Sequence, residues 1–330
     1  MAIGSPVVYA DFSGGINKEA GPYLLQENQC QDARNVTATI QGSLEKRRGF
    51  TSFSTIVDTN AVAKLDGEAH SLASANLSGG QYLIAVGKTP SASTDRIVSI
   101  SSSGIAETIK SGVTQGTRWE FAQAPIEIST NPDQGPIYAI NGVDTPQYWS
   151  GATGSTAMAE WTAEDDLQQA IPHPAKDSKF LIYHLDKLWA SGDTSKPGRI
   201  WSTGVDANGF PNPRNWDDDY RDDIEPSDGL QITGLGKVGP YLLVFKNSKT
   251  YVLTNPETRA YRPISSSIGC IAHRSIVETN EGTMFLSDDL GVCITDGTTV
   301  SRISNSIKQF LLDLISAQPV NIAYAAGAFF

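Results

Sequence analysis

The hydrophobic positions of the chain form short runs separated by turns. Each run holds aliphatic, β-branched or aromatic residues and ends at Gly, Asp, Asn or Ser, which is typical of β-strands. The pairs begin about 40–55 residues apart, the spacing of propeller blades. The runs come in pairs: 82–87 with 96–100, 137–142 with 146–150, 187–192 with 199–202, 241–245 with 250–254, and 283–288 with 291–297.

Further strands flank these pairs. Residues 71–75, 179–183 and 275–279 precede a pair, and residues 106–109 follow one. Three to four strands per unit is the content of a propeller blade. A single unit cannot bury both of its faces, so neighbouring units must stack. We therefore expect an all-β, β-propeller-like fold with five blades.

The two ends of the chain differ from this repeat. Residues 1–60 are expected to form an N-terminal arm that closes the array and docks it to a partner, and residues 61–330 form the propeller body. The apolar residues 322–330 either begin a sixth blade or pair with the arm to latch the ring.

One helix is expected near the C-terminus. Residues 306–309 have a capping-box pattern, and Ile307, Phe310, Leu311 and Leu314 then fall on one helical face. Packing on the strand array is favoured over a partner-binding helix. A second, shorter helix is expected from Gln26 to Asn35.

The composition excludes some classes of protein. A formal net charge of −11 and a pI near 4.8 argue against a general nucleic-acid binder. They allow a conduit along which nucleic acid slides. Cys30, Cys270 and Cys293 are far apart, which makes a zinc site or a disulfide framework improbable and favours a reducing compartment. The start resembles no secretory signal, and no apolar run reaches the roughly 18 residues of a membrane span.

The most charged stretch is residues 216–225. Clustered carboxylates can bind calcium, but the spacing does not fit an EF-hand loop. A solvated loop is the favoured interpretation. The alternative hypothesis is an acidic loop that faces a channel or a basic partner. Its residues are Asp217, Asp218, Asp219, Asp222, Asp223 and Glu225.

No pattern in the chain predicts catalysis. The four histidines show no metal-ligand spacing, and no nucleophile elbow, P-loop or dinucleotide fingerprint is present. Sialidase-type Asp boxes have only faint echoes at residues 191–193 and 287–289. We predict that the protein is not an enzyme and has no catalytic, cofactor-binding or metal-binding residues.

The N-terminal segment resembles a known family. It reads FSGGIN at residues 12–17, PYLL at 22–25, ENQ at 27–29, ARNV at 33–36 and GSLEKRRG at 42–49. In order and spacing these pieces are similar to the N-terminal signature of phage tail nozzle (tubular tail) proteins of short-tailed phages and related virion proteins. The resemblance covers about 42 of the 330 residues. This chain is shorter than is usual for that family, which puts the nozzle-tip and gate functions in doubt.

The resemblance implies a structural virion protein of a bacteriophage tail, made in the host bacterial cytoplasm. Such a protein forms a ring, commonly of six copies, around the DNA exit channel. It joins the portal or adaptor to tail fibres or tail-tip proteins, and DNA passes through without sequence-specific binding. The expected interface residues are Phe12, Gly14, Gly15, Asn17, Lys46, Arg47 and Arg48.

Two other functions stay open. The first is a host-surface carbohydrate-binding propeller or tail-fibre-like module. The second, much weaker, is a glycoside hydrolase, which needs a pair of carboxylates at a fixed separation. Ring formation independent of sugar favours the tail protein, and glycan binding by a monomer or trimer favours the module.

Overall fold

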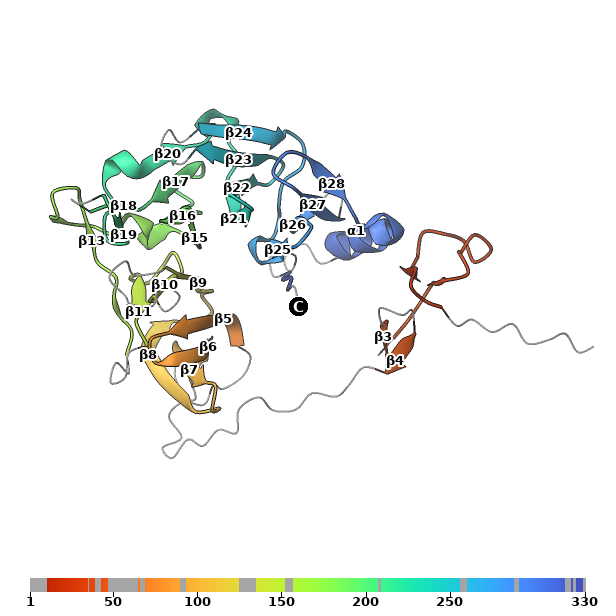
Figure 1. Ribbon diagram of the computed structural model, residues 1–330, viewed down its shortest axis with the longest axis horizontal. Coiled ribbons are helices and arrows are strands. Elements are labelled where there is room, and N and C mark those ends of the chain that lie inside the picture. The colour runs from red at the N-terminus through yellow and green to blue at the C-terminus, as the bar shows by residue number, and fades with distance from the viewer. Residues whose placement is uncertain are drawn as a thin grey trace, which may run out of the picture.

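The computed structural model describes most of the chain. It covers residues 11–34, 36–38, 43–46, 65, 69–89, 93–124, 135–151, 157–206, 209–255, 260–287, 291–317, 322 and 325–328 of 330. In these ranges strands dominate, and the α-helix is α1 (Lys308–Ala317). The strands include five four-stranded antiparallel sheets arranged around a centre (Figure 1). The predicted all-β, propeller-like fold is confirmed.

Each four-stranded sheet is one blade, built from strands in chain order. Every predicted strand pair forms the two middle strands of a blade. Blade 1 holds β5 (Ala69–Leu77), β6 (Gly80–Lys88), β7 (Thr94–Ser101) and β8 (Ala106–Thr114). Blade 2 holds β9 (Glu120–Gln123), β10 (Ile137–Ile140), β11 (Gln147–Trp149) and β12 (Ala159–Glu160), and blade 3 holds β15 (Phe180–His184), β16 (Lys187–Ser191), β17 (Arg199–Ser202) and β20 (Arg221–Asp223). Blade 4 holds β21 (Ile232–Val238), β22 (Tyr241–Lys246), β23 (Thr250–Asn255) and β24 (Ala260–Ser265), and blade 5 holds β25 (Val277–Thr279), β26 (Gly282–Ser287), β27 (Gly291–Thr295) and β28 (Val300–Arg302).

The first strand of each blade lies nearest the centre, and the last lies at the rim (Figure 1). Contacts run from β5 to β9, then to β15, β21 and β25. No described strand from the arm enters any of the five blades.

Hydrophobic clusters fill the spaces between neighbouring blades. One cluster joins blades 1 and 2, a second joins blades 2 and 3, a third joins blades 3 and 4, and a fourth joins blades 4 and 5. Among the described residues, no such cluster joins blade 5 to blade 1. We call this boundary the seam.

The second cluster extends into a small insertion beside blade 3. It contains the pairs β13 (Ala163–Glu164) with β14 (Ala170–Ile171) and β18 (Gly204–Val205) with β19 (Pro211–Asn212). The indoles of Trp161 and Trp216 both donate to the Pro213 carbonyl, at 2.9 and 3.0 Å. The His173 ring packs against both indoles, with centroids 4.6 and 5.3 Å away.

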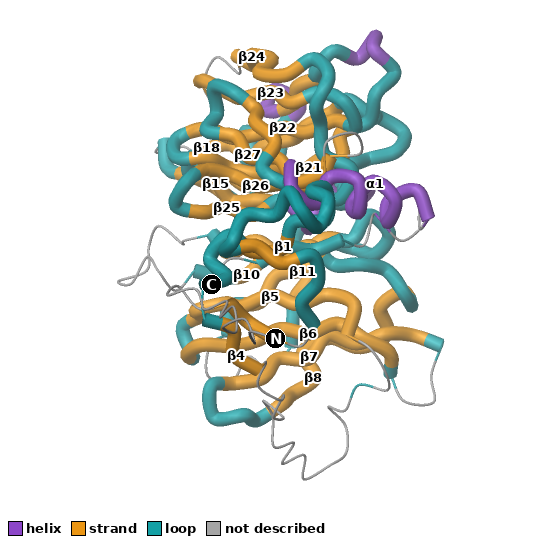
Figure 2. The backbone as a smooth tube through the Cα atoms, turned by 90° about the vertical axis from the view of Figure 1, so that its right-hand side faces the viewer, coloured by secondary structure: helices purple, strands orange, loops and turns teal. Residues whose placement is uncertain are grey.

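The arm lies outside the wheel, beside α1 (Figures 1 and 2). It contains β1 (Gly15–Ile16), which pairs in parallel with β2 (Gln29–Cys30), and β3 (Val36–Ala38), which pairs with β4 (Leu44–Lys46).

The helix predicted for residues 26–35 is wrong: residues 26–34 contain β2 and turns, and residue 35 lies outside the described residues. Backbone bonds from Gly14 to Asn28 and from Asn17 to Cys30 hold this segment extended, overriding a weak local propensity.

Short 3-10 turns connect several of the strands, and the last of them leads into α1. They are η2 (Pro174–Asp177), η3 (Asp218–Tyr220), η4 (Pro226–Asp228), η5 (His273–Ser275) and η6 (Asn305–Ile307). The η5 turn precedes β25 and places the side chains of His273 and Arg274 on the wall of the central cavity, close to the seam.

The buried imidazole of His173 predicts a specific acid sensitivity. Burial lowers the pKa of His173 to about 3. Its Nδ1 accepts from the Ala175 amide at 3.2 Å, so the neutral ring is the folded form. The unfolded chain takes up this proton near pH 6.5, so stability is full above that pH and falls as the pH drops toward 3, by up to about 1.4 kcal/mol per pH unit.

The variant His173→Asn keeps a side-chain acceptor for the Ala175 amide and removes the titrating group. We expect its urea midpoint to change less between pH 7 and pH 4 than that of the unchanged protein. Equal slopes for the two proteins would contradict the assignment, whatever their absolute stabilities.

Candidate functional site

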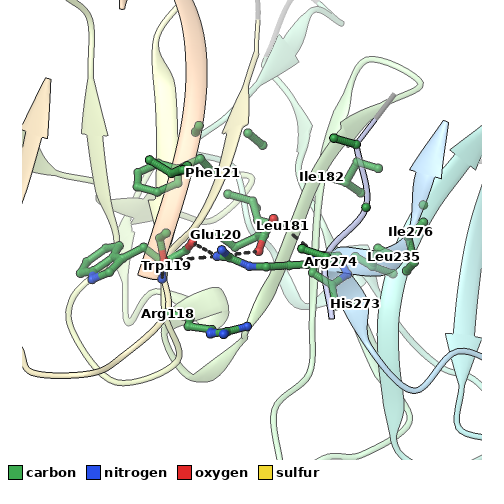
Figure 3. Close-up of a pocket in the computed structure, with 18 of the residues that line it drawn as sticks. Arg118, Trp119, Glu120, Phe121, Leu181, Ile182, Leu235, His273, Arg274 and Ile276 are labelled. Carbon is green, nitrogen blue, oxygen red and sulfur yellow. Dashed lines mark hydrogen bonds and ion pairs between the residues drawn. The ribbon is translucent and has the colours of Figure 1, made fainter. Parts of the chain in front are cut away.

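The centre of the wheel holds a cavity of about 880 Å³. Its wall comes from the inner strands of all five blades, together with η5 and residues 326–328 (Figure 3). We call the part of the wall near η5 and the starts of β5 and β9 the mouth of the cavity, and its ionisable side chains are His70, Arg118, Glu120, His273 and Arg274.

Arg274 reaches from η5 across this mouth to the opposite side of the seam (Figure 3). Its guanidinium donates to the His70 carbonyl at 3.2 Å, the Ser71 hydroxyl at 3.2 Å and the Trp119 carbonyl at 2.7 Å. Ser71 Oγ accepts a further bond from the Trp119 amide, at 3.0 Å. One side chain on blade 5 therefore joins blade 1 to the entry of blade 2. We call these contacts the seam clasp.

Glu120 completes the clasp with charge. Its carboxylate lies 3.4 Å from His273 Nε2 and 3.7 Å from Arg274 Nη2. The His273 ring also packs on Phe180, with centroids 4.5 Å apart. The Glu120 carboxylate therefore lies between the Arg274 guanidinium, with which it forms an ion pair, and the His273 imidazole.

A segment near the C-terminus lies against the clasp. The Gly327 amide donates to the Arg274 carbonyl at 2.9 Å. A Cβ at Gly327 would stand 2.6 Å from Val277 Cγ2, so this close approach requires glycine. Residues 325–328 form no strand, and no described bond joins them to the arm. The described part of 322–330 thus shows neither a sixth blade nor a latch.

The acidic stretch lies at the rim of blade 3, on η3 and β20, away from the central cavity. Arg199 donates two bonds to Asp223, at 2.8 and 2.7 Å, and these hold the pKa of Asp223 below its ordinary value. Arg221 pairs with Asp218 at 2.7 Å. Nearby basic side chains therefore offset part of the predicted negative charge.

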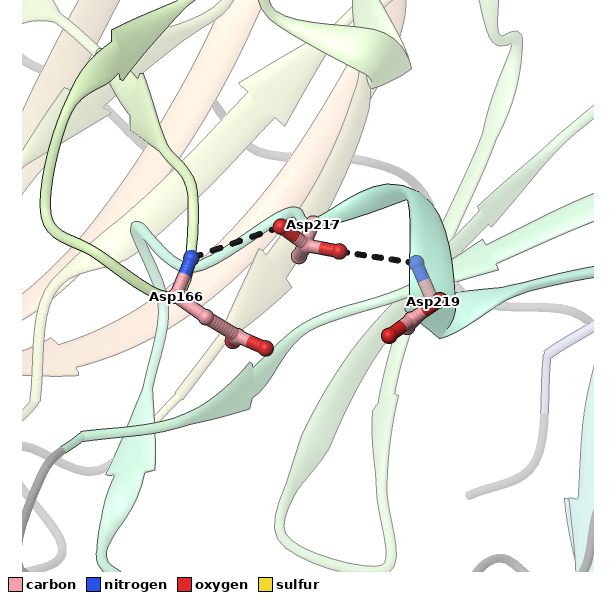
Figure 4. Close-up of side chains that lie close together, drawn as sticks. All are labelled: Asp166, Asp217 and Asp219. Atoms are coloured by element: carbon pink, nitrogen blue, oxygen red, sulfur yellow. Dashed lines mark hydrogen bonds between the residues drawn. The ribbon is translucent and has the colours of Figure 1, made fainter.

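Three carboxylates of this region come together: Asp166, Asp217 and Asp219 have oxygens within 4.8 Å of one another (Figure 4). Asp217 accepts the amides of Asp166, at 3.4 Å, and Asp219, at 2.9 Å. Asp166 accepts from Asn215 at 2.7 Å. The group serves as a turn network between η3 and the β13–β14 pair.

A fully buried lysine supports the end of the acidic stretch. Lys246 Nζ donates to the Ile224 carbonyl at 2.7 Å, the Glu225 carbonyl at 3.2 Å and Asp228 Oδ1 at 2.8 Å. Burial alone would raise the pKa of Asp228, but bonds from Lys246, the Leu230 amide and Lys249 hold it below its ordinary value. This group joins blade 4 to the connection that leaves blade 3.

The predicted interface residues lie in the arm. Gly14 is required there, because a Cβ would stand 2.6 Å from Asn28 Oδ1. Gly15 adopts φ +68°, which favours glycine. The Asn17 side chain donates to Gln29 and accepts the amides of Glu19 and Ala20. These three residues therefore build the arm itself.

The other members of that predicted set differ in exposure. Phe12 is half-buried and Lys46 is exposed on β4. Arg47 and Arg48 lie outside the described residues. An interface role for the whole set stays a prediction.

Sequence reasoning missed the contact between the arm and α1. The Lys18 amide donates to the Ser306 carbonyl at 3.0 Å, and the Gln309 amide donates to Glu19 Oε1 at 2.6 Å. Lys18 Nζ lies 4.1 Å from the centre of the Phe310 ring. We call this set of five residues the arm–helix contact.

The predicted capping box at residues 306–309 is wrong. The side chain of Gln309 donates to Asp313 at 2.8 Å, and the arm supplies the carboxylate that caps the helix. An amide of the first turn has no partner within a helix, so a carboxylate from elsewhere can satisfy it.

Comparisons with known proteins show resemblance only among solved structures. No protein-family model and no curated protein matches the chain. The Pan2 WD40 domain of Neurospora crassa is 10% identical, with 71% of this chain and 76% of that chain covered and a TM-score of 0.41. The periplasmic gluconolactonase PpgL of Pseudomonas aeruginosa is 14% identical, with 72% and 69% covered and a TM-score of 0.45.

PorZ, a bacterial surface component of the type-IX secretion system of Porphyromonas gingivalis, is 13% identical with a TM-score of 0.38. The alignment covers 74% of this chain and about a third (34%) of PorZ. At these identities and TM-scores the neighbours assign no function. One of them is an enzyme, and the absence of catalysis stays a prediction for this chain. No helix in the described ranges is long and apolar enough to span a membrane.

The seam clasp predicts that Arg274→Leu loosens one boundary of the wheel. Loss of the charged hydrogen bonds leaves buried carbonyls unsatisfied, and we expect a destabilisation of about 2–4 kcal/mol. Hydrogen exchange should rise in β5 and β25 before it rises in blades 3 and 4. Arg302→Leu, on the outer strand of blade 5, is the matched control. Unchanged protection of β5 in Arg274→Leu would contradict the role.

The buried amine of Lys246 gives a second prediction. Lys246→Met removes the buried ammonium from Asp228 and leaves the Ile224 and Glu225 carbonyls without this donor, and breaking a buried pair costs about 3–5 kcal/mol. Lys249→Met is the control, because Lys249 is partly exposed and such pairs contribute at most about 1 kcal/mol. Urea unfolding of the two variants checks the difference. Equal losses would count against the burial argument.

Proposed function

We propose that the protein is a structural component of a bacteriophage tail. It forms a ring of six copies around the DNA exit channel and joins the portal or adaptor to more distal tail parts. The sequence resemblance of the N-terminal segment supports this role. The formal net charge of −11 also suits a wall along which DNA slides, because like charge repels the phosphate backbone.

The observation that carries the proposal is the position of the arm. The described residues of the segment that resembles the tail-protein signature add no strand to the propeller and lie outside it, against α1. Within the arm, Tyr23 is fully exposed and Leu24 is 79% exposed. On the helix, Phe310 and Leu314 are about half exposed. Exposed large apolar side chains of this kind are available for contact with other proteins.

The acidic rim of blade 3 fits the same role as a second contact. Asp217, Asp218, Asp219, Asp222, Asp223 and Glu225 lie on the outside of the propeller, where a neighbouring subunit or the lumen of an assembled ring can face them. We therefore keep the hypothesis that this loop faces the ring lumen or a basic partner.

The test is assembly of the purified full chain. We expect light scattering and negative-stain images to show a closed ring whose formation needs no sugar. Tyr23→Ser with Leu24→Ser should weaken assembly at least tenfold, because these side chains are exposed in the single chain. Leu167→Ser, which removes an exposed apolar side chain on the β13–β14 turn, is the matched control.

A chain that stays monomeric at all concentrations would contradict the tail-ring proposal. Binding of that monomer to a glycan array would instead support the carbohydrate-binding alternative. Turnover of a polysaccharide would contradict the expectation that the protein is not an enzyme.

A further inference from the structure

The arm–helix contact is a small and separate docking surface. It consists of one backbone bond, one helix-capping carboxylate and one cation–π contact, all within residues 18–19 and 306–310. Other hydrogen bonds of the described residues 11–34, such as those of Asn17, Asn28 and Gln31, stay within the arm.

The contact is also specific. Glu19 places a carboxylate at the N-terminus of α1, where the orphan amides and the helix dipole favour negative charge. Lys18 lies beside it over the Phe310 ring, the geometry of a cation–π contact. Because Glu19 binds the helix amide and Lys18 lies over the Phe310 ring, the arm fits this end of α1 in one orientation.

The connection between the arm and blade 1 allows this contact to form between two copies. Residues 47–68 separate β4 from β5. A chain of that length reaches at most about 70 Å when extended. A domain of this size has a radius of gyration of roughly 18–20 Å. The arm can therefore reach the helix of a neighbouring copy as well as its own.

We propose that in the assembled ring each arm docks on α1 of the next copy, through the same five residues that form the arm–helix contact. Exchange of an identical element between copies creates no new contacts and is a low-cost route to association. Because arm and helix are different surfaces, the interface is head-to-tail, the type that closes into rings. This inference rests on the proposed ring.

The exposed apolar residues of the arm and of α1 support a second copy as the occupant. Tyr23 and Leu24 on the arm, and Phe310 and Leu314 on the helix, stay largely in water when the arm lies on its own chain. None of the ten residues of α1 is fully buried. Packing of neighbouring copies around the contact would remove this apolar surface from water, which is favourable.

Engineered disulfides test the exchange directly. The backbones of residues 18 and 306 are hydrogen-bonded, a separation that suits a disulfide. The background is Cys30→Ser in the full chain. Burial raises the pKa of the Cys270 and Cys293 thiols to about 11, so both stay unreactive at pH 8. Lys18→Cys and Ser306→Cys leave the Glu19 cap in place.

The double variant Lys18→Cys with Ser306→Cys should give a ladder of covalent oligomers on a non-reducing gel. A mixture of the two single variants, one of them tagged, should give a covalent heterodimer. A mixture of Lys18→Cys with Leu167→Cys is the collision control and should give at least fivefold less. Adding Glu19→Gln to the mixture should lower the heterodimer yield several-fold, because the capping charge is lost.

The outcomes separate this inference from the proposed function. Rings in solution together with only internally cross-linked monomer in the double variant would overturn the exchange and leave the ring proposal standing. A ladder without closed rings would support the exchange and contradict the ring. A monomer that cross-links only within itself would overturn both.

Discussion

The architecture depends on the need of each four-stranded sheet to cover both of its faces. A sheet whose middle strands are apolar on both sides cannot stand alone, so each blade packs against the next. The five blades are arranged around a centre, and the described residues build hydrophobic clusters at the four boundaries between consecutive blades. The remaining boundary, between blades 5 and 1, is held by contacts of another kind.

The contacts at this boundary are polar. Arg274 crosses the mouth of the cavity and satisfies two backbone carbonyls and one hydroxyl on the far side of the seam. Hydrogen bonds from a charged donor contribute more than neutral ones, and their geometry fixes the two edges in register. Glu120 keeps the guanidinium in place and is itself shared with His273. The seam clasp thus lies at the central cavity, and the charges of Arg274 and Glu120 stabilise the contact between blade 5 and blades 1 and 2.

The sequence predicts the blades well because their signal is local. Alternating apolar runs bounded by turn residues specify strands, and the pairs at residues 82–100 and 241–254 each lie in the middle of a blade. Such patterns also predict α1, whose apolar positions recur at helical spacing.

The features that the sequence did not predict all depend on long-range contacts. Arg274 carries no local sign that it will bond residues about 200 positions away. Residues 26–34 look helical, but backbone pairing with β1 decides their conformation. The capping-box pattern at residues 306–309 is present, yet Glu19, 290 positions away, supplies the cap. In each case a tertiary contact outweighs a local preference of a few tenths of a kcal/mol.

The arm and α1 depend on each other for a physical reason. A helix of ten residues is marginal in water and takes its stability from packing and capping. In α1 the packing is partial, since Phe310 and Leu314 remain exposed, and the cap comes from the arm. Docking of the arm and order in the helix are therefore coupled. The N-terminal end of α1 is therefore completed only when an arm docks on it. Order in this helix can thus depend on whether a neighbouring copy supplies the arm, whereas the edge of a preformed sheet is already ordered.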